Sequence, residues 1–163
     1  MLDGIHKIHL IGIGGSGMRA IANILIQKGY DVSGSDIAES AVISKFRDMG
    51  ATVHIGHNKE YVNGVDAIVR STAIREDNPE IVAAKEQGIT ILHRSDIVKA
   101  VLDVTDGIAV AGAHGKTSTT SMIGQILVEA NADPTVIIGG EVDYLKGSSC
   151  LGKGHFSVVE ADE

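Results

Sequence analysis

Residues that could bind and transfer phosphate stand close together in one short segment, Gly112-Ala113-His114-Gly115-Lys116-Thr117-Ser118. The segment follows an apolar stretch and opens a helical pattern. Its glycines let backbone N–H groups turn toward phosphate oxygens, and a helix N-terminus adds partial positive charge. Lys116 could reach the β- and γ-phosphates, and the Thr117 hydroxyl could bind Mg²⁺. The segment therefore predicts a loop for the phosphates of ATP.

The match to the common phosphate-loop pattern is incomplete, because Val110 stands where that pattern has its first glycine. A plain strand–helix turn with a solvated Lys116 is the structural alternative. Glu160 favours the phosphate loop. It follows the apolar stretch 156–159, and an acidic residue at a strand end can hold Mg²⁺ opposite the Thr117 hydroxyl. We expect Lys116 to be catalytic and Thr117 and Glu160 to be the metal ligands.

A second glycine-rich segment, Gly12-Ile13-Gly14-Gly15-Ser16-Gly17, fits the dinucleotide fingerprint between a strand and an amphipathic helix. Asp36 closes the next strand, where a carboxylate could accept hydrogen bonds from a ribose. The segment predicts a site for the pyrophosphate of a nucleotide, and a packing turn without ligand is its alternative. His57 could line the same pocket, although a plain loop position is the simpler interpretation.

Short apolar stretches alternate with helical patterns along most of the chain. Strands are expected at residues 7–13, 30–34, 51–55, 67–69, 89–92, 108–111, 136–138 and 156–159. This alternation predicts a doubly wound, Rossmann-like parallel α/β sheet. The pattern restarts at the second glycine turn, which indicates the beginning of a second, P-loop-type α/β domain for ATP. We place the boundary after Val104, giving domains of residues 1–104 and 105–163.

Two of the expected helices carry clear local signals. Asn78 and Pro79 predict a helix start, because Asn caps a helix N-terminus and Pro suits the first turn. Gly88 predicts the end of that helix. The expected buried stripe of the later helix, over residues 116–130, consists of Ile123, Ile126, Leu127 and Ala130.

Composition and charge exclude several classes of partner. A formal net charge of −7 argues against nucleic acid, which requires a basic face. Cys150 is the only cysteine, which fits a reducing compartment, and we expect a small structural residue rather than a nucleophile. No apolar stretch approaches the roughly 20 residues needed to cross a bilayer, and residues 1–3 lack the basic start of a signal peptide. We expect a cytoplasmic protein without membrane contact.

In their order and spacing, these motifs resemble those of the Mur ligases of peptidoglycan synthesis. The matching segments are Gly12–Met18, Val32–Asp36, Ser71–Ile74, Asp77–Glu80, Gly112–Thr117 and Glu160–Glu163. This family uses a shorter phosphate loop, which accounts for Val110. Ala113 and Thr72 stand where Thr and Ser are more usual in relatives, and neither change removes a phosphate-binding group.

The resemblance implies a reaction in which ATP phosphorylates the lactyl carboxylate of UDP-N-acetylmuramate and the amine of L-alanine attacks the acyl phosphate. It implies ATP and Mg²⁺ as cofactors. The implied ATP-binding residues are Gly112, Ala113, His114, Gly115, Lys116, Thr117 and Ser118. The implied UDP-sugar-binding residues are Gly14, Gly15, Ser16, Gly17, Met18, Asp36, Ser71, Thr72 and Ala73.

Other functions stay open on the residues alone. A related ligase could attach a peptide instead of L-alanine, because the selecting residues are expected beyond Glu163. An NAD-dependent dehydrogenase would use the first glycine segment and Asp36 but would leave Lys116 without a role. A non-catalytic module would only bind nucleotide. The chain stops directly after a strand without a closing helix, so we expect a truncated ATP domain and a fragment that by itself is inactive.

Overall fold

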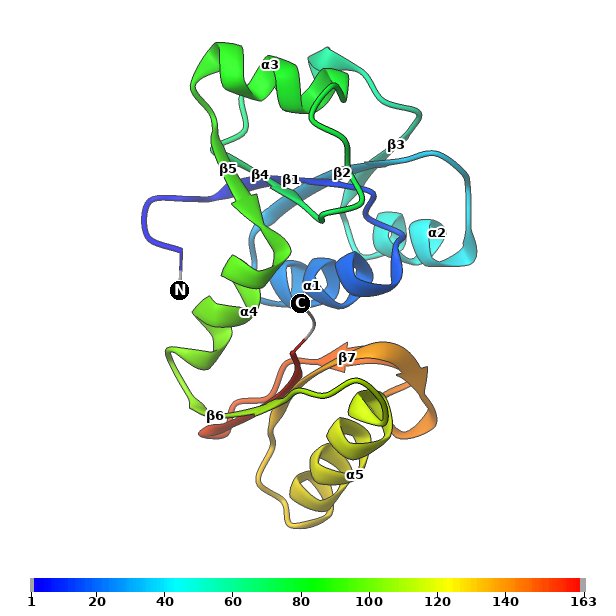
Figure 1. The fold of residues 1–163 in the computed structure, drawn as a ribbon, viewed down its shortest axis with the longest axis vertical. Helices are drawn as coiled ribbons and strands as arrows, with labels where there is room; N and C mark the ends of the chain where they lie inside the picture. Colours follow the sequence, from blue (N-terminus) through cyan, green and yellow to red (C-terminus); the bar gives the residue numbers. More distant parts are fainter. Residues whose placement is uncertain (1, 162–163) are drawn as a thin grey trace. The chain divides into compact units, whose positions relative to one another are not determined.

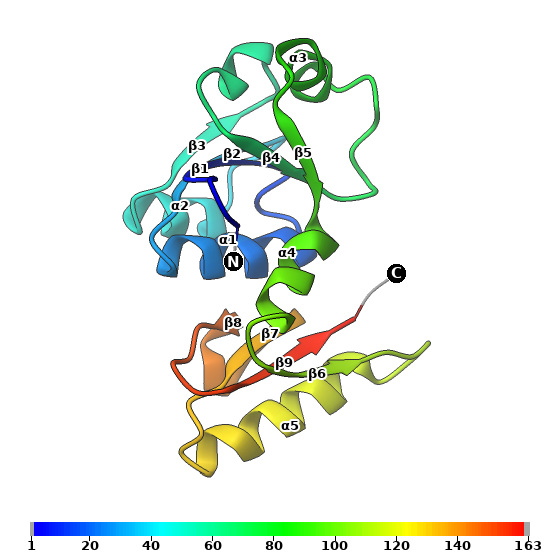
Figure 2. The same ribbon diagram turned by 90° about the vertical axis from the view of Figure 1, so that its left-hand side faces the viewer.

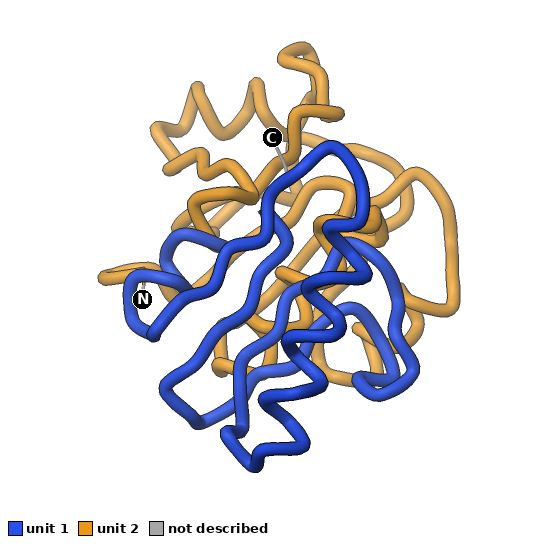
Figure 3. Tube along the Cα trace, turned by 60° about the horizontal axis from the view of Figure 1, so that its bottom comes forward, with its two compact units in different colours: residues 1, 98–163 blue, residues 2–97 orange. Residues whose placement is uncertain are grey.

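A computed structural model describes residues 2–161, which form two compact units. Met1 lies outside the described residues, as do Asp162 and Glu163 of the last matching motif. The units comprise residues 2–97 and 98–161 (Figure 3). The division falls inside helix α4 (Arg94–Leu102), a little before the boundary expected after Val104.

The first unit is built on a five-stranded sheet in the order β3-β2-β1-β4-β5, and all its strands are parallel (Figure 1). Its strands are β1 (Lys7–Ile11), β2 (Asp31–Asp36), β3 (Thr52–Ile55), β4 (Ala67–Arg70) and β5 (Thr90–His93). The order reverses between β1 and β4. In open α/β sheets, ligands bind beyond the carboxyl ends of the strands at this reversal. The α/β fold expected from the sequence is confirmed.

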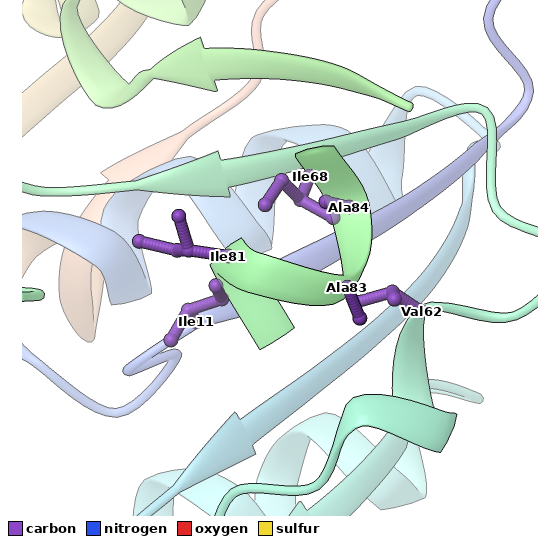
Figure 4. Close-up of a cluster of buried hydrophobic side chains, with 6 residues drawn as sticks. All are labelled: Ile11, Val62, Ile68, Ile81, Ala83 and Ala84. Carbon is purple, nitrogen blue, oxygen red and sulfur yellow. The ribbon is translucent and has the colours of Figure 1, made fainter. Parts of the chain in front are cut away.

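Helices cover both faces of this sheet (Figures 1 and 2). Helices α1 (Ser16–Gln27) and α2 (Ala41–Asp48) lie on one face, and α3 (Pro79–Gln87) lies on the other with the short 3-10 helix η1 (Lys59–Val62). Figure 4 shows the core beneath α3. Buried side chains of α3 pack there with others from the sheet and η1: Ile11, Val62, Ile68, Ile81, Ala83 and Ala84.

The second unit contains a four-stranded sheet in the order β6-β9-β7-β8. Its strands are β6 (Asp106–Val110), β7 (Thr135–Val142), β8 (Gly147–Cys150) and β9 (Phe156–Glu160). Helix α5 (Lys116–Glu129) packs against β7 and β9. Strand β8 was not expected from the sequence. It follows the short 3-10 helix η2 (Asp143–Leu145) and pairs antiparallel with β7.

The expected buried stripe of α5 is wrong for two of its four residues. Ile126 is 66% exposed and Ala130 is also exposed. The fully buried positions are Thr120 and Gly124. A Cβ atom at Gly124 would lie 3.2 Å from Val136, so the small residue sets a close approach to the sheet. The helix therefore packs through its small residues, which hydrophobic spacing cannot identify.

The predicted signals around α3 are confirmed. The side chain of Asn78 accepts a hydrogen bond from the Glu80 backbone at 2.9 Å, Pro79 opens the helix, and Gly88 ends it in the left-handed conformation. None of the helices in residues 2–161 combines the length and apolar character that a membrane span requires.

A glycine in the middle of β2 allows the first glycine segment to pack onto the sheet. A Cβ atom at Gly34 would lie 2.7 Å from Ile13 Cδ1 and 2.9 Å from the carbonyl oxygen of Leu10. We expect Gly34→Ala to lower the free energy of unfolding by about 1–3 kcal/mol through overpacking, measured by urea denaturation. Gly147→Ala is the matched control, because the space around Gly147 is open. Equal losses in both variants would contradict this explanation.

Candidate functional site

The first glycine segment forms a tight turn between β1 and α1. The carbonyl oxygen of Ser35, on β2, accepts hydrogen bonds from the backbone N–H groups of Gly12 at 2.8 Å and Ile13 at 3.1 Å. Gly12 adopts a φ of +73°, which favours glycine. Helix α1 begins at Ser16 with Gly15 as its N-cap, so no side chain of the cap residue covers the first-turn N–H groups. Such a helix start can bind an anion.

Asp36 holds this turn from the side. Its Oδ2 atom accepts a hydrogen bond from the Gly14 backbone at 2.8 Å, and its Oδ1 atom accepts one from the Ile37 backbone at 2.8 Å. A Cβ atom at Gly14 would lie 3.0 Å from that carboxylate, so a larger residue would push the carboxylate slightly away from the backbone. Both oxygens of the predicted ribose acceptor are therefore engaged by the main chain.

The loop after β4 reaches the same end of the sheet. It carries the predicted residues Ser71, Thr72 and Ala73, and the next side chain, Ile74, has its Cδ1 atom 3.4 Å from the place of a Cβ atom at Gly12. The structure thus brings two separately predicted segments together.

Ion pairs fix that loop to its surroundings. Glu76 contacts Lys85 of α3 at 2.7 Å and Arg70 of β4 at 2.5 Å. Hydrogen bonds from Lys85 and Arg70 hold the pKa of the Glu76 carboxyl below its usual range. The loop is therefore tied to the strand before it and to the helix after it.

Arg94 is a site candidate that no sequence motif indicated. It directly follows β5, and its Nη1 atom is 2.9 Å from the place that a Cβ atom at Gly17 would occupy. A guanidinium thus stands against the first turn of α1. Phosphate is the group that guanidinium and helix N-termini both favour. The sequence does show a basic residue directly after an expected strand. That pattern points to a site only when the order of the strands in the sheet is known.

The second glycine segment opens α5 in the other unit. Gly115 is its N-cap with a φ of +75°, and the Lys116 ammonium donates a hydrogen bond to the Gly112 carbonyl oxygen at 2.9 Å. Ala113, His114 and Ser118 are exposed. The lysine side chain therefore folds back over its own loop.

Thr117 and Glu160 are in direct contact. The Thr117 hydroxyl lies 2.9 Å from Glu160 Oε1 and 3.1 Å from Oε2, and the Gly139 backbone donates to Oε2 at 2.6 Å. One hydroxyl and one carboxylate are hard oxygen ligands of the kind Mg²⁺ takes together with phosphates and water. Within residues 2–161 no three His, Cys, Asp or Glu side chains gather around a metal position. This pair therefore fits an ion shared with a phosphate ligand.

Cys150 does not have the environment of a nucleophile. Its thiol is partly buried and lies 3.5 Å from the carbonyl oxygen of Pro134. Burial raises the pKa of the Cys150 thiol, which disfavours the reactive thiolate. This agrees with the structural role expected from the sequence.

A cavity of about 460 Å³ lies at the opposite end of the first sheet. It is lined by residues at the start of β1, β2 and β3, including Lys7, Asp31 and Thr52. None of the predicted site residues lines it. The cavity is therefore separate from the strand ends at which the glycine turn is held.

A fully buried carboxylate, Glu80 of α3, contacts Ser35, the residue that holds the glycine turn, and was not predicted. It accepts hydrogen bonds from His9 Nε2 at 3.0 Å, Ser35 Oγ at 2.7 Å and His57 Nδ1 at 2.9 Å, and from the Asn58 backbone at 3.3 Å. Burial raises the pKa of Glu80, but the hydrogen bonds from His9, Ser35 and His57 outweigh burial and bring it below the usual value. Glu80 is thus a buried, ionised anchor.

This buried carboxylate makes stability depend on pH. Because the pKa of folded Glu80 lies below its ordinary value of 4.5, its contribution is present above that value and is lost as the pH falls through the folded-state pKa. We expect Glu80→Gln to be less stable at neutral pH and to lose less stability than wild type on acidification. Thermal unfolding at a series of pH values measures both effects.

Glu86→Gln is the control for this experiment, because Glu86 is exposed on the same helix. It should keep the wild-type pH dependence. An unchanged acid profile in Glu80→Gln would show that Glu80 does not titrate as described.

Comparison with known proteins gives consistent matches along the chain. The family model described as "Mur ligase family, catalytic domain" matches residues 7–104. The UDP-N-acetylmuramate–L-alanine ligase of Solidesulfovibrio magneticus is 46% identical over 163 residues, which is 100% of this chain and 36% of that protein. The chain thus spans about a third of the length of such relatives.

Solved structures show the same similarity. The UDP-N-acetylmuramate–alanine ligase MurC of Thermotoga maritima superposes with a TM-score of 0.87 at 35% identity, covering 94% of this chain and 36% of that one. The UDP-N-acetylmuramate:L-alanyl-gamma-D-glutamyl-meso-diaminopimelate ligase of Neisseria meningitides gives a TM-score of 0.88 at 28% identity, covering 98% and 53%.

Proposed function

Because the chain belongs to the Mur ligase family, we propose that it is the nucleotide-binding part of an ATP-dependent ligase that joins L-alanine to the lactyl carboxylate of UDP-N-acetylmuramate. The observation that carries this proposal is the 46% identity, over the whole chain, to a relative named for that reaction. The two glycine turns supply what the reaction needs, which is one site for each of two phosphate-bearing substrates. Both substrates fit a cytoplasmic location.

In this proposal, residues 1–104 bind the UDP-sugar. The diphosphate lies at the N-terminus of α1, over Gly14–Met18, and Arg94 supplies a cation that offsets its charge. Asp36 acts by holding Gly14, while the loop Ser71–Ala73 closes the pocket beside Gly12. The contact between Ile74 and Gly12 supports this arrangement.

Residues 105–163 supply the ATP loop. Backbone N–H groups of Gly112–Ser118 bind the phosphates, and Lys116 exchanges its contact with the Gly112 carbonyl for a phosphate oxygen. Thr117 and Glu160 would hold Mg²⁺, which neutralises charge on the transferring phosphoryl group when bound. Their direct contact supports this role.

The chemistry requires activation of the carboxylate. A carboxylate is a poor acyl donor because oxide would have to leave, whereas the phosphate of an acyl phosphate leaves readily. The carboxylate takes the γ-phosphoryl group of ATP, and ADP leaves. The amine of L-alanine then attacks the acyl carbon, phosphate leaves and the amide forms. Lys116 offsets the repulsion between the two anionic substrates, and positioning of the carboxylate near the γ-phosphorus supplies much of the rate.

A ligase that attaches a peptide is the second candidate. It is favoured by the TM-score of 0.88 to the Neisseria meningitides protein, whose name specifies a tripeptide. The lower identity of 28% in that pair, against 46% with the alanine ligase, favours L-alanine.

The preference of the chain for UDP ligands or for NADH distinguishes the proposed ligase from a dehydrogenase. We expect isothermal titration calorimetry of the 163-residue chain to show binding of UDP-N-acetylmuramate and of UDP, because the glycine turn and Arg94 provide a diphosphate site. NADH should bind more weakly by at least about tenfold, which corresponds to about 1.4 kcal/mol. Tight NADH binding without UDP binding would overturn the proposed function.

Removal of Lys116 tests whether the second glycine turn serves ATP and the first serves the UDP-sugar. In a ligase of the relatives' full length that carries this sequence, we expect Lys116→Ala to reduce kcat by at least about a hundredfold, as loss of transition-state charge stabilisation does. The affinity for UDP-N-acetylmuramate should stay within about twofold of wild type. Steady-state phosphate release and calorimetry measure the two quantities. Lys153→Ala, which removes an exposed lysine of the same unit, is the control.

A large loss of UDP-sugar affinity in Lys116→Ala would contradict the assignment. It would mean that the roles of the two glycine turns are reversed.

A further inference from the structure

We propose that His57 is a nucleotide-binding residue whose Nε2 atom accepts a hydrogen bond from a ribose hydroxyl of the uridine nucleotide, and that Glu80 is the positioning residue that orients it. The proposal rests on the proposed function, since it concerns the UDP site of the first unit. It follows from three observations: the place of His57, the hydrogen bonds around Glu80, and the place of Asp36 at the end of β2.

His57 is linked to the glycine turn by Ser35, which contacts both. The Ser35 carbonyl holds Gly12 and Ile13, and the Ser35 hydroxyl lies 3.2 Å from His57 Nδ1. The Gly56 backbone also donates to the Asp36 carbonyl oxygen at 2.8 Å, which fixes the segment after β3 against the end of β2. His57 therefore stands at the carboxyl ends of the strands, where the nucleotide is expected.

The donors around Glu80 determine which nitrogen of His57 carries a proton. A carboxylate accepts hydrogen bonds and donates none, so each partner must supply a hydrogen. His57 Nδ1 must therefore carry one toward Glu80 Oε1 at 2.9 Å. In the neutral ring, this leaves a lone pair on Nε2. The ring is thus held in one tautomer by a buried group.

That Nε2 atom takes no part in the buried network. The His57 side chain is 22% exposed whereas Glu80 is fully buried, and no hydrogen bond found within residues 2–161 takes up His57 Nε2. An acceptor that is oriented by a buried carboxylate and left open at a ligand-binding edge is preorganised to receive a donor.

The place of His57 selects the donor on the nucleotide. Phosphate oxygens are acceptors and would face the Nε2 lone pair unfavourably, whereas ribose hydroxyls and the uracil N3–H can donate. The usual ribose acceptor at the end of the second strand is an acidic residue. Here each Asp36 oxygen accepts one backbone hydrogen bond, from Gly14 or from Ile37. The Gly56 backbone holds the segment of His57 against the same strand end, so the Nε2 lone pair is a further acceptor where the ribose is expected.

The test pairs His57→Ala with deoxynucleotides. Calorimetry on the complete chain would use UDP, 2′-deoxy-UDP and 3′-deoxy-UDP as ligands. We expect His57→Ala to weaken UDP binding about five- to tenfold, the effect of one lost hydrogen bond. One deoxy analogue should bind wild type more weakly by a similar factor and should lose little further affinity in His57→Ala.

Glu80→Gln tests the positioning role. The glutamine amide presents a donor as well as an acceptor, so His57 should no longer be held in one tautomer. We expect ¹⁵N NMR to show His57 Nε2 unprotonated in wild type and a mixture of tautomers in Glu80→Gln, with UDP binding about two- to fivefold weaker. Wild-type Nε2 found protonated would overturn the proposal.

His54→Ala is the control, because the His54 ring lies on β3 near His57 but stacks on Tyr61 at a centroid distance of 4.0 Å. It should leave the affinities for UDP and both deoxy analogues unchanged. Circular dichroism melting verifies that each variant is folded at the titration temperature.

The outcomes separate the two proposals. Wild-type chain that fails to bind UDP would overturn the proposed function. Wild-type chain that binds UDP while His57→Ala binds it equally well would overturn only the role of His57. Equal weakening of UDP and both analogues in His57→Ala would also overturn it, since the loss would not depend on a ribose hydroxyl.

Discussion

The structure of the first unit depends on one buried carboxylate. A charged group removed from water requires hydrogen-bond donors on all sides, and Glu80 receives them from β1, β2 and the segment after β3. Because Glu80 lies on α3, the same contacts fix this helix across the strands. The position of Ser35, and with it the glycine turn that its carbonyl holds, follows from this arrangement.

The two glycine turns are built on a common principle. In each, a helix starts directly after glycine, and a carboxylate from a neighbouring strand end steadies the site. The carboxylates differ in what they contact: Asp36 is bonded to the backbone of its own turn, whereas Glu160 contacts the Thr117 hydroxyl. The first arrangement fixes the backbone of the turn. The second leaves a hydroxyl and a carboxylate together, which suits a cation and a transferable phosphate.

Much of the fold could be predicted from the sequence, because buried parallel strands and capped helices have local signatures. The bounds of α3 followed from Asn78, Pro79 and Gly88. The contact between Thr117 and Glu160 followed from the expectation that both hold one Mg²⁺ ion. Strand β8 could not be found, since Gly147–Cys150 lacks the branched and aromatic residues that favour strands. The contacts of Arg94 and Glu80 depend on strand order. Hydrophobic periodicity is a local signal, so it does not predict which distant residues the topology brings together.

The hydrogen bond from Lys116 to the Gly112 carbonyl has a thermodynamic consequence for ligand capture. A free lysine side chain loses about 1.5–2 kcal/mol of conformational entropy when it is immobilised. In this loop the ammonium is already held at 2.9 Å from a carbonyl oxygen, so much of that loss has been incurred during folding. If the loop binds ATP as proposed, a phosphate oxygen would replace the Gly112 carbonyl as the acceptor, and association would require little further ordering of the side chain.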